Sequence, residues 1–255
     1  MNPAEYDRMA ELEATHWWYV GVRDLFQRLL ENGRFRLSAR PNVLDAGCGS
    51  GAHLQLLQDV LRPAYLGGFD VADQAVRHAR EKNPAADVYQ ADLCRPELHV
   101  DELDLILCCD VLYTTPLEEG VAGLRILCDR LRSGGLLMLH LPAYDWLTSS
   151  HDLAVHTRQR FTTQAARRIV TSLGLQNELL TYRMFVLFPA IVIRRLPSIL
   201  RRGPATAEQA NSDLQPVRAS LNHVLRSALH FENHVIARGI PLPWGSSIVA
   251  VGRKP

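Results

Sequence analysis

The glycine-rich segment VLDAGCGSG, residues 43–51, constrains the fold of this chain more than any other feature. Its first half reads as a short apolar strand, its second half brings three glycines at alternate positions, and a helical pattern follows at residues 53–61. A strand that turns tightly into a helix through glycines is the first unit of many parallel α/β sheets, and it lets backbone approach a bound nucleotide. The segment therefore predicts a nucleotide site at the carboxyl end of this strand.

The rest of the chain extends the same alternation. We expect a long N-terminal helix over residues 4–31, and then strands and helices in turn up to Pro142. The expected strands are residues 42–46, 65–69, 86–90, 104–109 and 136–141, and the helices between them are residues 72–82 and 120–131. Strands that alternate with helices predict a doubly wound, mostly parallel sheet.

The regular alternation of strands and helices ends at Pro142, and a polar loop is expected over residues 144–161. The segments expected after it are a helix at 162–173, a strand at 175–187, a linker at 203–216, an amphipathic helix at 217–238 and a last strand at 246–252. The predicted apolar face of that amphipathic helix comprises Val217, Leu221, Val224, Leu225, Ala228, Val235 and Ile236.

Composition excludes several classes of protein. The chain has 255 residues and a formal net charge of +1, which gives no electrostatic reason to expect nucleic acid as a partner. Its five cysteines form no C-x-x-C pair and are interpreted as reduced core residues. The acidic first residues do not resemble a signal peptide, and no apolar run approaches the length of a membrane span. These features predict a cytoplasmic protein.

The glycines alone do not identify the nucleotide, because they satisfy both the dinucleotide pattern G-x-G-x-x-G/A and the pattern G-x-G-x-G. Asp45 separates the two. A carboxylate there would repel a pyrophosphate bound at the helix N-terminus, whereas it would stabilise the ammonium and sulfonium groups of S-adenosylmethionine. Asp70 and Asp92 end the next two strands, where their carboxylates can accept hydrogen bonds from ribose hydroxyls and from an adenine amino group.

Five segments in order carry a family resemblance: VLDAGCGSG, GFDVADQAV, QADL, DLILCCDVLY and LRSGGLLMLHLP. Together they resemble the successive motifs of class I S-adenosylmethionine-dependent methyltransferases from about residue 43 to residue 142. The resemblance implies a seven-stranded Rossmann-like sheet with an antiparallel last strand, and S-adenosylmethionine as cofactor. The cofactor-binding residues it implies are Asp45, Gly47, Cys48, Gly49, Gly51, Asp70, Val71, Asp92, Leu93 and Asp110.

Both ends of the chain resemble one subgroup of small bacterial methyltransferases, those with type 11 or type 12 methyltransferase domains. The similar segments are EATHWW at residues 13–18, the stretch at 151–162 and LPWGSS at 242–247. The expected organisation has three parts: a helical cap at residues 1–40, a cofactor-binding core at 41–187 plus 244–255, and a helical insertion at 188–243 that serves as substrate or lid region.

One departure from the family affects catalysis. Many relatives read D-V-L-E-H after the fourth strand, whereas this chain reads DVLYT at residues 110–114, so base chemistry assigned to that histidine cannot be carried over. The polar loop that follows the fifth strand offers other groups that can exchange protons at the cofactor. We expect Tyr144, His151 or His156 to act there, with Asp152 beside His151.

The remaining histidines and arginines of interest are expected to lie outside any metal or substrate site. No metal site is expected, because His230 and His234 lack the adjacent Glu of H-E-x-x-H. Arg158 and Arg160 are expected to lie solvated at the surface. The apolar, arginine-bearing segment at residues 184–202 has the composition of a peripheral membrane contact.

These features predict a methyltransferase that acts on a small molecule, most simply on oxygen, with an apolar or lipid-linked metabolite as one candidate acceptor. An NAD-dependent oxidoreductase and a non-catalytic methyltransferase-like subunit of a complex are the alternatives. Methylation of nucleic acid is disfavoured, because residues 110–114 stand where an N-P-P-Y-type segment would be.

Overall fold

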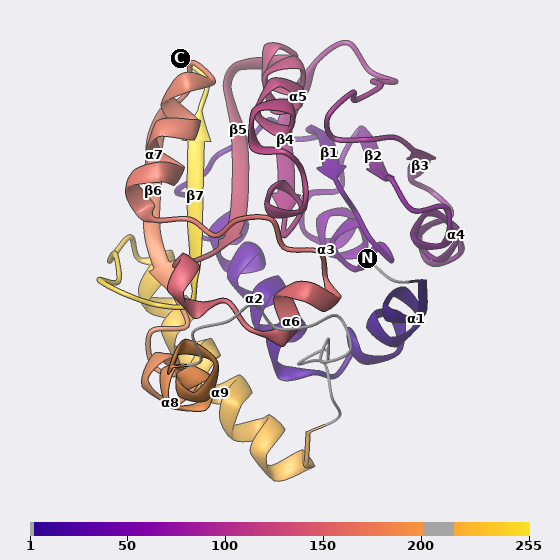
Figure 1. Ribbon diagram of the computed structural model, residues 1–255. Coiled ribbons are helices and arrows are strands. Elements are labelled where there is room, and N and C mark those ends of the chain that lie inside the picture. The colour runs from indigo at the N-terminus through magenta and orange to yellow at the C-terminus, as the bar shows by residue number, and fades with distance from the viewer. Residues whose placement is uncertain (1–2, 201–216) are drawn as a thin grey trace.

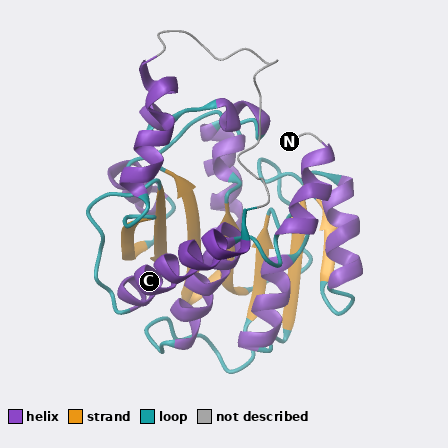
Figure 2. Ribbon diagram, turned by 90° about the horizontal axis from the view of Figure 1, so that it is seen from below, coloured by secondary structure: helices purple, strands orange, loops and turns teal. Residues whose placement is uncertain are grey.

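The computed structural model describes residues 3–200 and 217–255, which contain one seven-stranded sheet with helices on both faces (Figures 1 and 2). The strand order is β3-β2-β1-β4-β5-β7-β6, with β7 antiparallel to both of its neighbours. The strands are β1 (Asn42–Ala46), β2 (Tyr65–Asp70), β3 (Asp87–Gln90), β4 (Leu103–Cys109), β5 (Leu131–Pro142), β6 (Gln176–Arg183) and β7 (Ser247–Arg253). This topology confirms the predicted fold.

The central strand β4 is buried at every position, which explains its uninterrupted apolar sequence. Its alternate side chains contribute to two separate cores. The helices of the first core are α5 (Leu117–Asp129) and α7 (Thr163–Ser172). The helices of the second core are α2 (Trp17–Glu31), α3 (Ala52–Leu61), α4 (Asp73–Lys82) and α9 (Ala219–Ala237).

The N-terminal segment forms two helices, so the prediction of one helix over residues 4–31 was wrong. The first helix, α1 (Pro3–Leu12), ends before residues 13–16, and α2 begins at Trp17. His16 has an extended backbone and accepts a hydrogen bond from the Trp18 N–H at 3.4 Å, so it caps α2. The helical pattern of apolar residues continues through residues 13–16, but the cap at His16 starts a new helix there.

The face that α9 buries differs from the predicted one. Leu221 and Val224 are 51% and 62% exposed, whereas Glu232 and Asn233 are buried beside Ile236. The apolar pattern alone does not give this face, because α9 buries the polar Glu232 and Asn233 together with Leu229 and Ile236.

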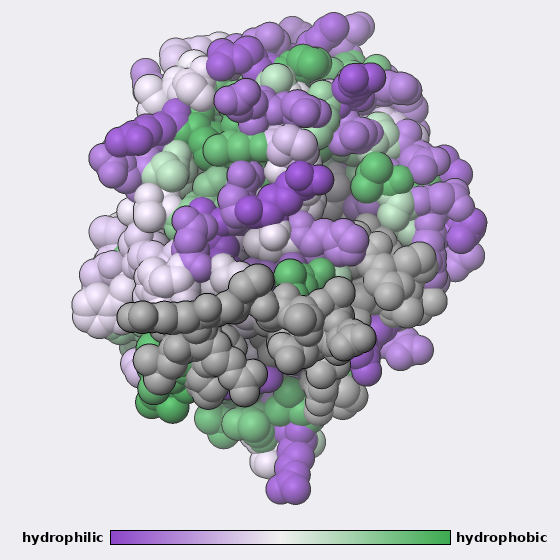
Figure 3. Space-filling model, viewed as in Figure 1, coloured by the Kyte–Doolittle hydropathy of each residue, from purple (hydrophilic) through white to green (hydrophobic). Residues whose placement is uncertain are grey.

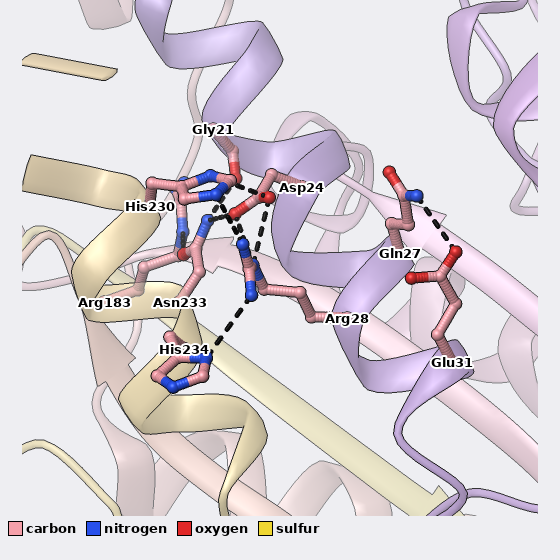
Figure 4. Close-up of polar contacts among 9 residues, drawn as sticks. All are labelled: Gly21, Asp24, Gln27, Arg28, Glu31, Arg183, His230, Asn233 and His234. Carbon is pink, nitrogen blue, oxygen red and sulfur yellow. Dashed lines mark hydrogen bonds and ion pairs between the residues drawn. The ribbon is translucent and has the colours of Figure 1, made fainter. Parts of the chain in front are cut away.

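Figure 4 shows these polar contacts between α9 and α2. The Asn233 amide donates to the Gly21 carbonyl at 2.8 Å and to Asp24 at 2.9 Å. His230 and His234 both face Arg28, at 2.6 and 3.4 Å. The two histidines thus contact a cation on a neighbouring helix.

The segment at residues 144–161 is more ordered than the predicted polar loop. It contains the short helices η2 (Asp145–Leu147) and α6 (Ser150–Ala154). Arg160 pairs with the buried carboxylate of Asp152 at 2.8 Å and donates to the Ala143 carbonyl at 3.0 Å. The expectation that Arg160 is solvated was therefore wrong, because its charge is neutralised inside the loop.

After β6 the chain forms α8 (Phe188–Leu200), which contacts η2. The predicted linker at residues 203–216, with Arg201 and Arg202 before it, lies outside the described residues. Among the helices that are described, none combines the length and apolar character needed to cross a bilayer.

Candidate functional site

The loop between β1 and α3 needs its glycines. Gly47, Gly49 and Gly51 have φ values of 88°, 52° and 86°, a backbone conformation that favours glycine. A Cβ on Gly47 would lie 2.1 Å from a methyl group of Val111. The N–H groups of Gly47 and Cys48 both donate to the Phe69 carbonyl at 2.8 Å, which fastens the loop to β2.

Asp45 stands at the carboxyl end of β1, completely buried. Neither of its carboxylate oxygens has a hydrogen-bond partner among the described residues. Burial, and secondly the charge of Asp70, raise the pKa of Asp45 to about 8. Buried polar atoms are normally hydrogen-bonded, so a carboxylate left without a partner beside a glycine loop marks a place for a donor or cation that a ligand brings.

Asp70 ends the neighbouring strand β2 and holds the same loop. Its two carboxylate oxygens accept from the Gly49 N–H and from the Ala72 N–H, each at 3.0 Å. Burial raises the pKa of Asp70, while these two backbone hydrogen bonds oppose the rise. The carboxylate therefore braces the glycine loop and lies beside the space above it.

The predicted adenine end of the site follows β3. Asp92 is exposed, and its carboxylate accepts from the Cys94 N–H at 2.9 Å. Leu93 is buried in the first core, whereas Val71, after β2, is 61% exposed. The structure thus brings Asp45, Asp70 and Asp92 to the carboxyl ends of three adjacent strands, and their contacts with a cofactor remain predictions.

The N-terminal helix α1 lies against the glycine loop. A Cβ on Gly49 would come within 3.0 Å of the Met9 methyl carbon. Just after α1, the buried Glu13 accepts a hydrogen bond from Ser50 in the loop and pairs with Lys82 of α4. Sequence reasoning used Glu13 only as part of the EATHWW segment and missed this connection, which is non-local.

A second polar group lies where β4 and β5 end, and it pairs Asp110, which was predicted as a cofactor-binding residue, with His140, which sequence reasoning missed. The Asp110 carboxylate accepts from the Cys109 thiol at 3.4 Å and lies 2.9 Å from Nδ1 of His140. The Asp110 N–H also donates to the His140 carbonyl at 3.1 Å. Asp110 has a φ of 59°, an unusual value for a residue with a side chain and one that is often found at functional sites. The signal for His140 was a single polar residue inside the apolar run LLMLHLP.

The predicted catalytic candidates lie in the segment after β5. The backbone of His151 belongs to α6, and its side chain is outside the described part of the chain. His156 is exposed, with a φ of 59°. Tyr144 stacks on Tyr182 with ring centroids 5.1 Å apart, and burial raises the pKa of its hydroxyl. Asp152 is engaged by Arg160, and the catalytic roles of the three candidates remain predictions.

A buried arginine lies among the polar groups between α9 and β6. Arg183, at the end of β6, is fully buried, and its Nε donates to the Asn233 side chain at 3.3 Å. Glu232 lies close enough to offset the lowering of the Arg183 pKa that burial causes, and it accepts from the Met184 and Val186 N–H groups at 2.5 and 3.1 Å. These residues fix β6, α9 and the start of α8 to one another.

A cavity of about 400 Å³ lies elsewhere, between α2, α3 and α9. Its described lining includes Arg23, Asp59 and Arg226 and none of the predicted cofactor residues. The candidate site is therefore the loop cluster at the carboxyl ends of β1, β2 and β4, where ligands of open α/β sheets bind.

Comparisons with known proteins agree with this location. Residues 43–135 match the family model described as a methyltransferase domain. A probable S-adenosylmethionine-dependent methyltransferase of Mycobacterium tuberculosis is 29% identical over 152 residues, 58% of this chain and 52% of that protein. The trans-aconitate 2-methyltransferase of Paracidovorax citrulli is 33% identical over 113 residues, 43% of this chain and 42% of the relative. The chain thus spans about half the length of these curated relatives.

Solved structures share the fold. One chain of a complex between the Trm112 methyltransferase activator of Haloferax volcanii and a methyltransferase aligns with a TM-score of 0.61 at 18% identity, covering 99% of this chain and 95% of that one. An S-adenosylmethionine-dependent methyltransferase from Mesorhizobium loti aligns with a TM-score of 0.55 at 14% identity, covering 88% of this chain and 95% of that one. The strand order agrees with this match, and residues 43–135, which include the glycine loop, are similar to the methyltransferase domain family.

Proposed function

We propose that this protein transfers a methyl group from S-adenosylmethionine to an oxygen atom of a small molecule. The observation that carries the proposal is the Asp45 carboxylate, which is buried without a partner beside the glycine loop of a methyltransferase domain. An ammonium or sulfonium group would supply the missing charge partner, whereas a pyrophosphate would not.

The residues present fit this cofactor. The methionine end of the cofactor would be held by Asp45, Gly47, Cys48, Gly49 and Gly51. Position 47 has space only for glycine, because a Cβ there would collide with Val111. When bound, the cofactor supplies an electrophilic methyl group on a positively charged sulfur.

The other predicted contacts would hold the nucleoside. Asp70 and Val71 would contact the ribose, and Asp92 with Leu93 the adenine. Val71 and Asp92 are exposed after β2 and β3, so their side chains are accessible to a bound adenosine group.

A small acceptor is supported by the relatives, several of which are trans-aconitate 2-methyltransferases. The predicted cap at residues 1–40 and the predicted insertion at residues 188–243 are additions to the cofactor-binding core, and such additions usually determine substrate choice.

Calorimetric titration with S-adenosylhomocysteine, run beside a titration with NADH, tests the assignment. We expect saturable binding of S-adenosylhomocysteine and no heat from NADH. The reverse result would show the dinucleotide alternative, and failure of both ligands would support a non-catalytic subunit.

A further inference from the structure

We propose that His140, held by Asp110, is the catalytic base that removes a proton from a hydroxyl group of the methyl acceptor. The inference rests on the proposed function and deepens it, because it makes the acceptor an alcohol or phenol. Some relatives are named for trans-aconitate, a carboxylate. An acceptor that is already a carboxylate needs no base.

The hydrogen bonds around Asp110 assign the imidazole tautomer. The Asp110 carboxylate is an acceptor, so Nδ1 of His140, at 2.9 Å, carries the proton of that hydrogen bond. Burial raises the pKa of Cys109 well above its usual value, so its thiol keeps a proton and also donates to Asp110. Nε2 of His140 is left with its lone pair, as in a base that a carboxylate orients.

Nε2 has no partner within the described structure, although the side chain is only 1% exposed. A buried nitrogen without a hydrogen bond requires an explanation, and a hydroxyl group of a bound acceptor provides one. The Trp18 ring lies edge-on to the imidazole with centroids 6.1 Å apart, so it would form a wall of the acceptor site.

His140 also lies on the correct side of the sheet. Because strand side chains alternate, His140 follows Leu136 and Met138 toward the second core, and Asp45 follows Val43 toward the same core. Their strands β1 and β5 flank β4. Asp45 and Nε2 of His140, one acidic and one basic, are two of the buried groups without a hydrogen-bond partner among the described residues, and they occupy the same face of the sheet.

The side chains of Cys109, Asp110 and His140 contain atoms of the kinds that bind metal ions, all within 4.8 Å of one another. Their hydrogen bonds favour the base instead. A metal needs a sulfur and an imidazole nitrogen that are free to coordinate it, whereas the Cys109 thiol and Nδ1 of His140 both bond to the Asp110 carboxylate.

The charge on His140 depends on the groups around it. Asp110 favours the protonated imidazole that forms during reaction, as the acid of a catalytic triad does. His53 of α3 is neutral near pH 7, because burial lowers its pKa to about 4. The other titratable groups that share the electrostatic environment of this cluster include Arg23, Tyr19, Asp45, Cys109, Tyr113 and Arg183.

The proposed step conserves atoms and charge. The acceptor O–H proton moves to Nε2, and the electrons of that O–H bond remain on oxygen. The oxygen forms a bond to the methyl carbon while the carbon–sulfur electron pair leaves with sulfur. The products are a methyl ether, neutral S-adenosylhomocysteine and an imidazolium that later returns its proton to water.

The test compares His140→Gln with His223→Gln, an exposed histidine on α9, as matched control. Each protein receives deuterated-methyl S-adenosylmethionine and a small-molecule extract of the host, and labelled product is quantified by mass spectrometry. We expect His140→Gln to lower the rate by about 10²–10⁴-fold. Its affinity for S-adenosylhomocysteine should stay within about threefold of wild type, since the base does not hold the donor.

Asp110→Asn provides the second variant, with Asp59→Asn on the exposed side of α3 as its control. Nitrogen NMR of the protein without ligand should show the Nδ1–H tautomer of His140 in wild type and its loss in Asp110→Asn. If His140→Gln does not fold, Asp110→Asn and the NMR tautomer still decide.

The product gives an independent outcome. We expect the labelled product to survive mild alkali, as a methyl ether does, whereas a labelled product that releases methanol is an ester and overturns the inference. Wild-type turnover in His140→Gln, or an Nε2–H tautomer in wild type, would also overturn it. Failure of wild type to bind S-adenosylhomocysteine would instead contradict the proposed function itself.

Discussion

At the scale of single residues, the site is defined by Asp45, a buried carboxylate without a hydrogen-bond partner among the described residues. Burial raises the pKa of Asp45 to about 8. Its folded-state pKa lies above its unfolded value of about 4, so the folded protein binds the proton more tightly. The contribution of Asp45 therefore lowers the free energy of unfolding as pH rises from about 4 to about 8.

Asp45→Asn should remove this dependence. Across that window the free energy of unfolding of the variant should gain on wild type by up to about 1.4 kcal/mol for each pH unit, while binding of S-adenosylhomocysteine is lost. Urea denaturation of both proteins from about pH 5 to about pH 9 measures the difference. If the free energies of unfolding of the two proteins changed in parallel with pH, folding would not raise the pKa of Asp45.

Asp70→Ala should weaken S-adenosylhomocysteine binding by about 10-fold to 150-fold, because it removes a charged acceptor and releases the Gly49 N–H. Calorimetry measures the change. Asp73→Ala, three residues on and exposed, is the control and should bind as wild type does. Equal affinity in Asp70→Ala and wild type would remove Asp70 from the cofactor site.

The sequence predicted Asp45, Asp70 and Asp92 as site residues because each follows a strand in a short local motif. It did not predict the pairing of Asp110 with His140, which are 30 residues apart and meet only because β4 and β5 are neighbours.

At the scale of elements, the helices on the second face are held by polar contacts as much as by apolar burial. The helix α9 buries Glu232 and Asn233 against β6 and α2, and Arg183 is buried beside them. Hydrophobic periodicity does not register such contacts, which is why the predicted face of α9 was partly wrong. The strands were predicted more accurately, because buried parallel strands have an apolar signal of their own.

Glu232→Gln should destabilise the protein by about 1–3 kcal/mol, because it removes a charge that offsets the burial of the Arg183 guanidinium and weakens the hydrogen bonds from the Met184 and Val186 N–H groups. The matched control is Glu31→Gln on α2, whose carboxylate is exposed and bonds to Gln27 at 3.0 Å (Figure 4). That control should stay within about 0.5 kcal/mol of wild type. Urea denaturation compares the two variants, and equal stabilities would show that Arg183 does not depend on Glu232.

At the scale of the whole molecule, apolar side chains gather at the end formed by α8 and α9, as Figure 3 shows. On α8, Ile193 is 71% exposed and Leu196 is 44% exposed. Arg195 points inward instead, donating to the Leu147 carbonyl, so it would not reach lipid headgroups as predicted for this segment. We propose that this end contacts a membrane surface through its apolar side chains.

Ile193→Asp should then reduce co-sedimentation with phosphatidylglycerol-containing vesicles by about threefold or more, since a charge replaces a side chain that would enter the interface. Its affinity for S-adenosylhomocysteine should not change. Leu117→Asp, an exposed apolar residue on α5 with a similar change in charge, is the control. Equal sedimentation of Ile193→Asp and wild type, or none by either protein, would contradict membrane contact through α8.

The central claim is that the acidic loop cluster holds a methyl donor and that the protein transfers the methyl group to a small molecule. Mass spectrometry of a host small-molecule extract, incubated with the protein and deuterated-methyl S-adenosylmethionine, tests it most directly. The account predicts a small molecule that gains the deuterated methyl group with wild type and does not gain it with Asp45→Asn. No labelled small molecule with wild type, or equal labelling by the variant, would contradict the account.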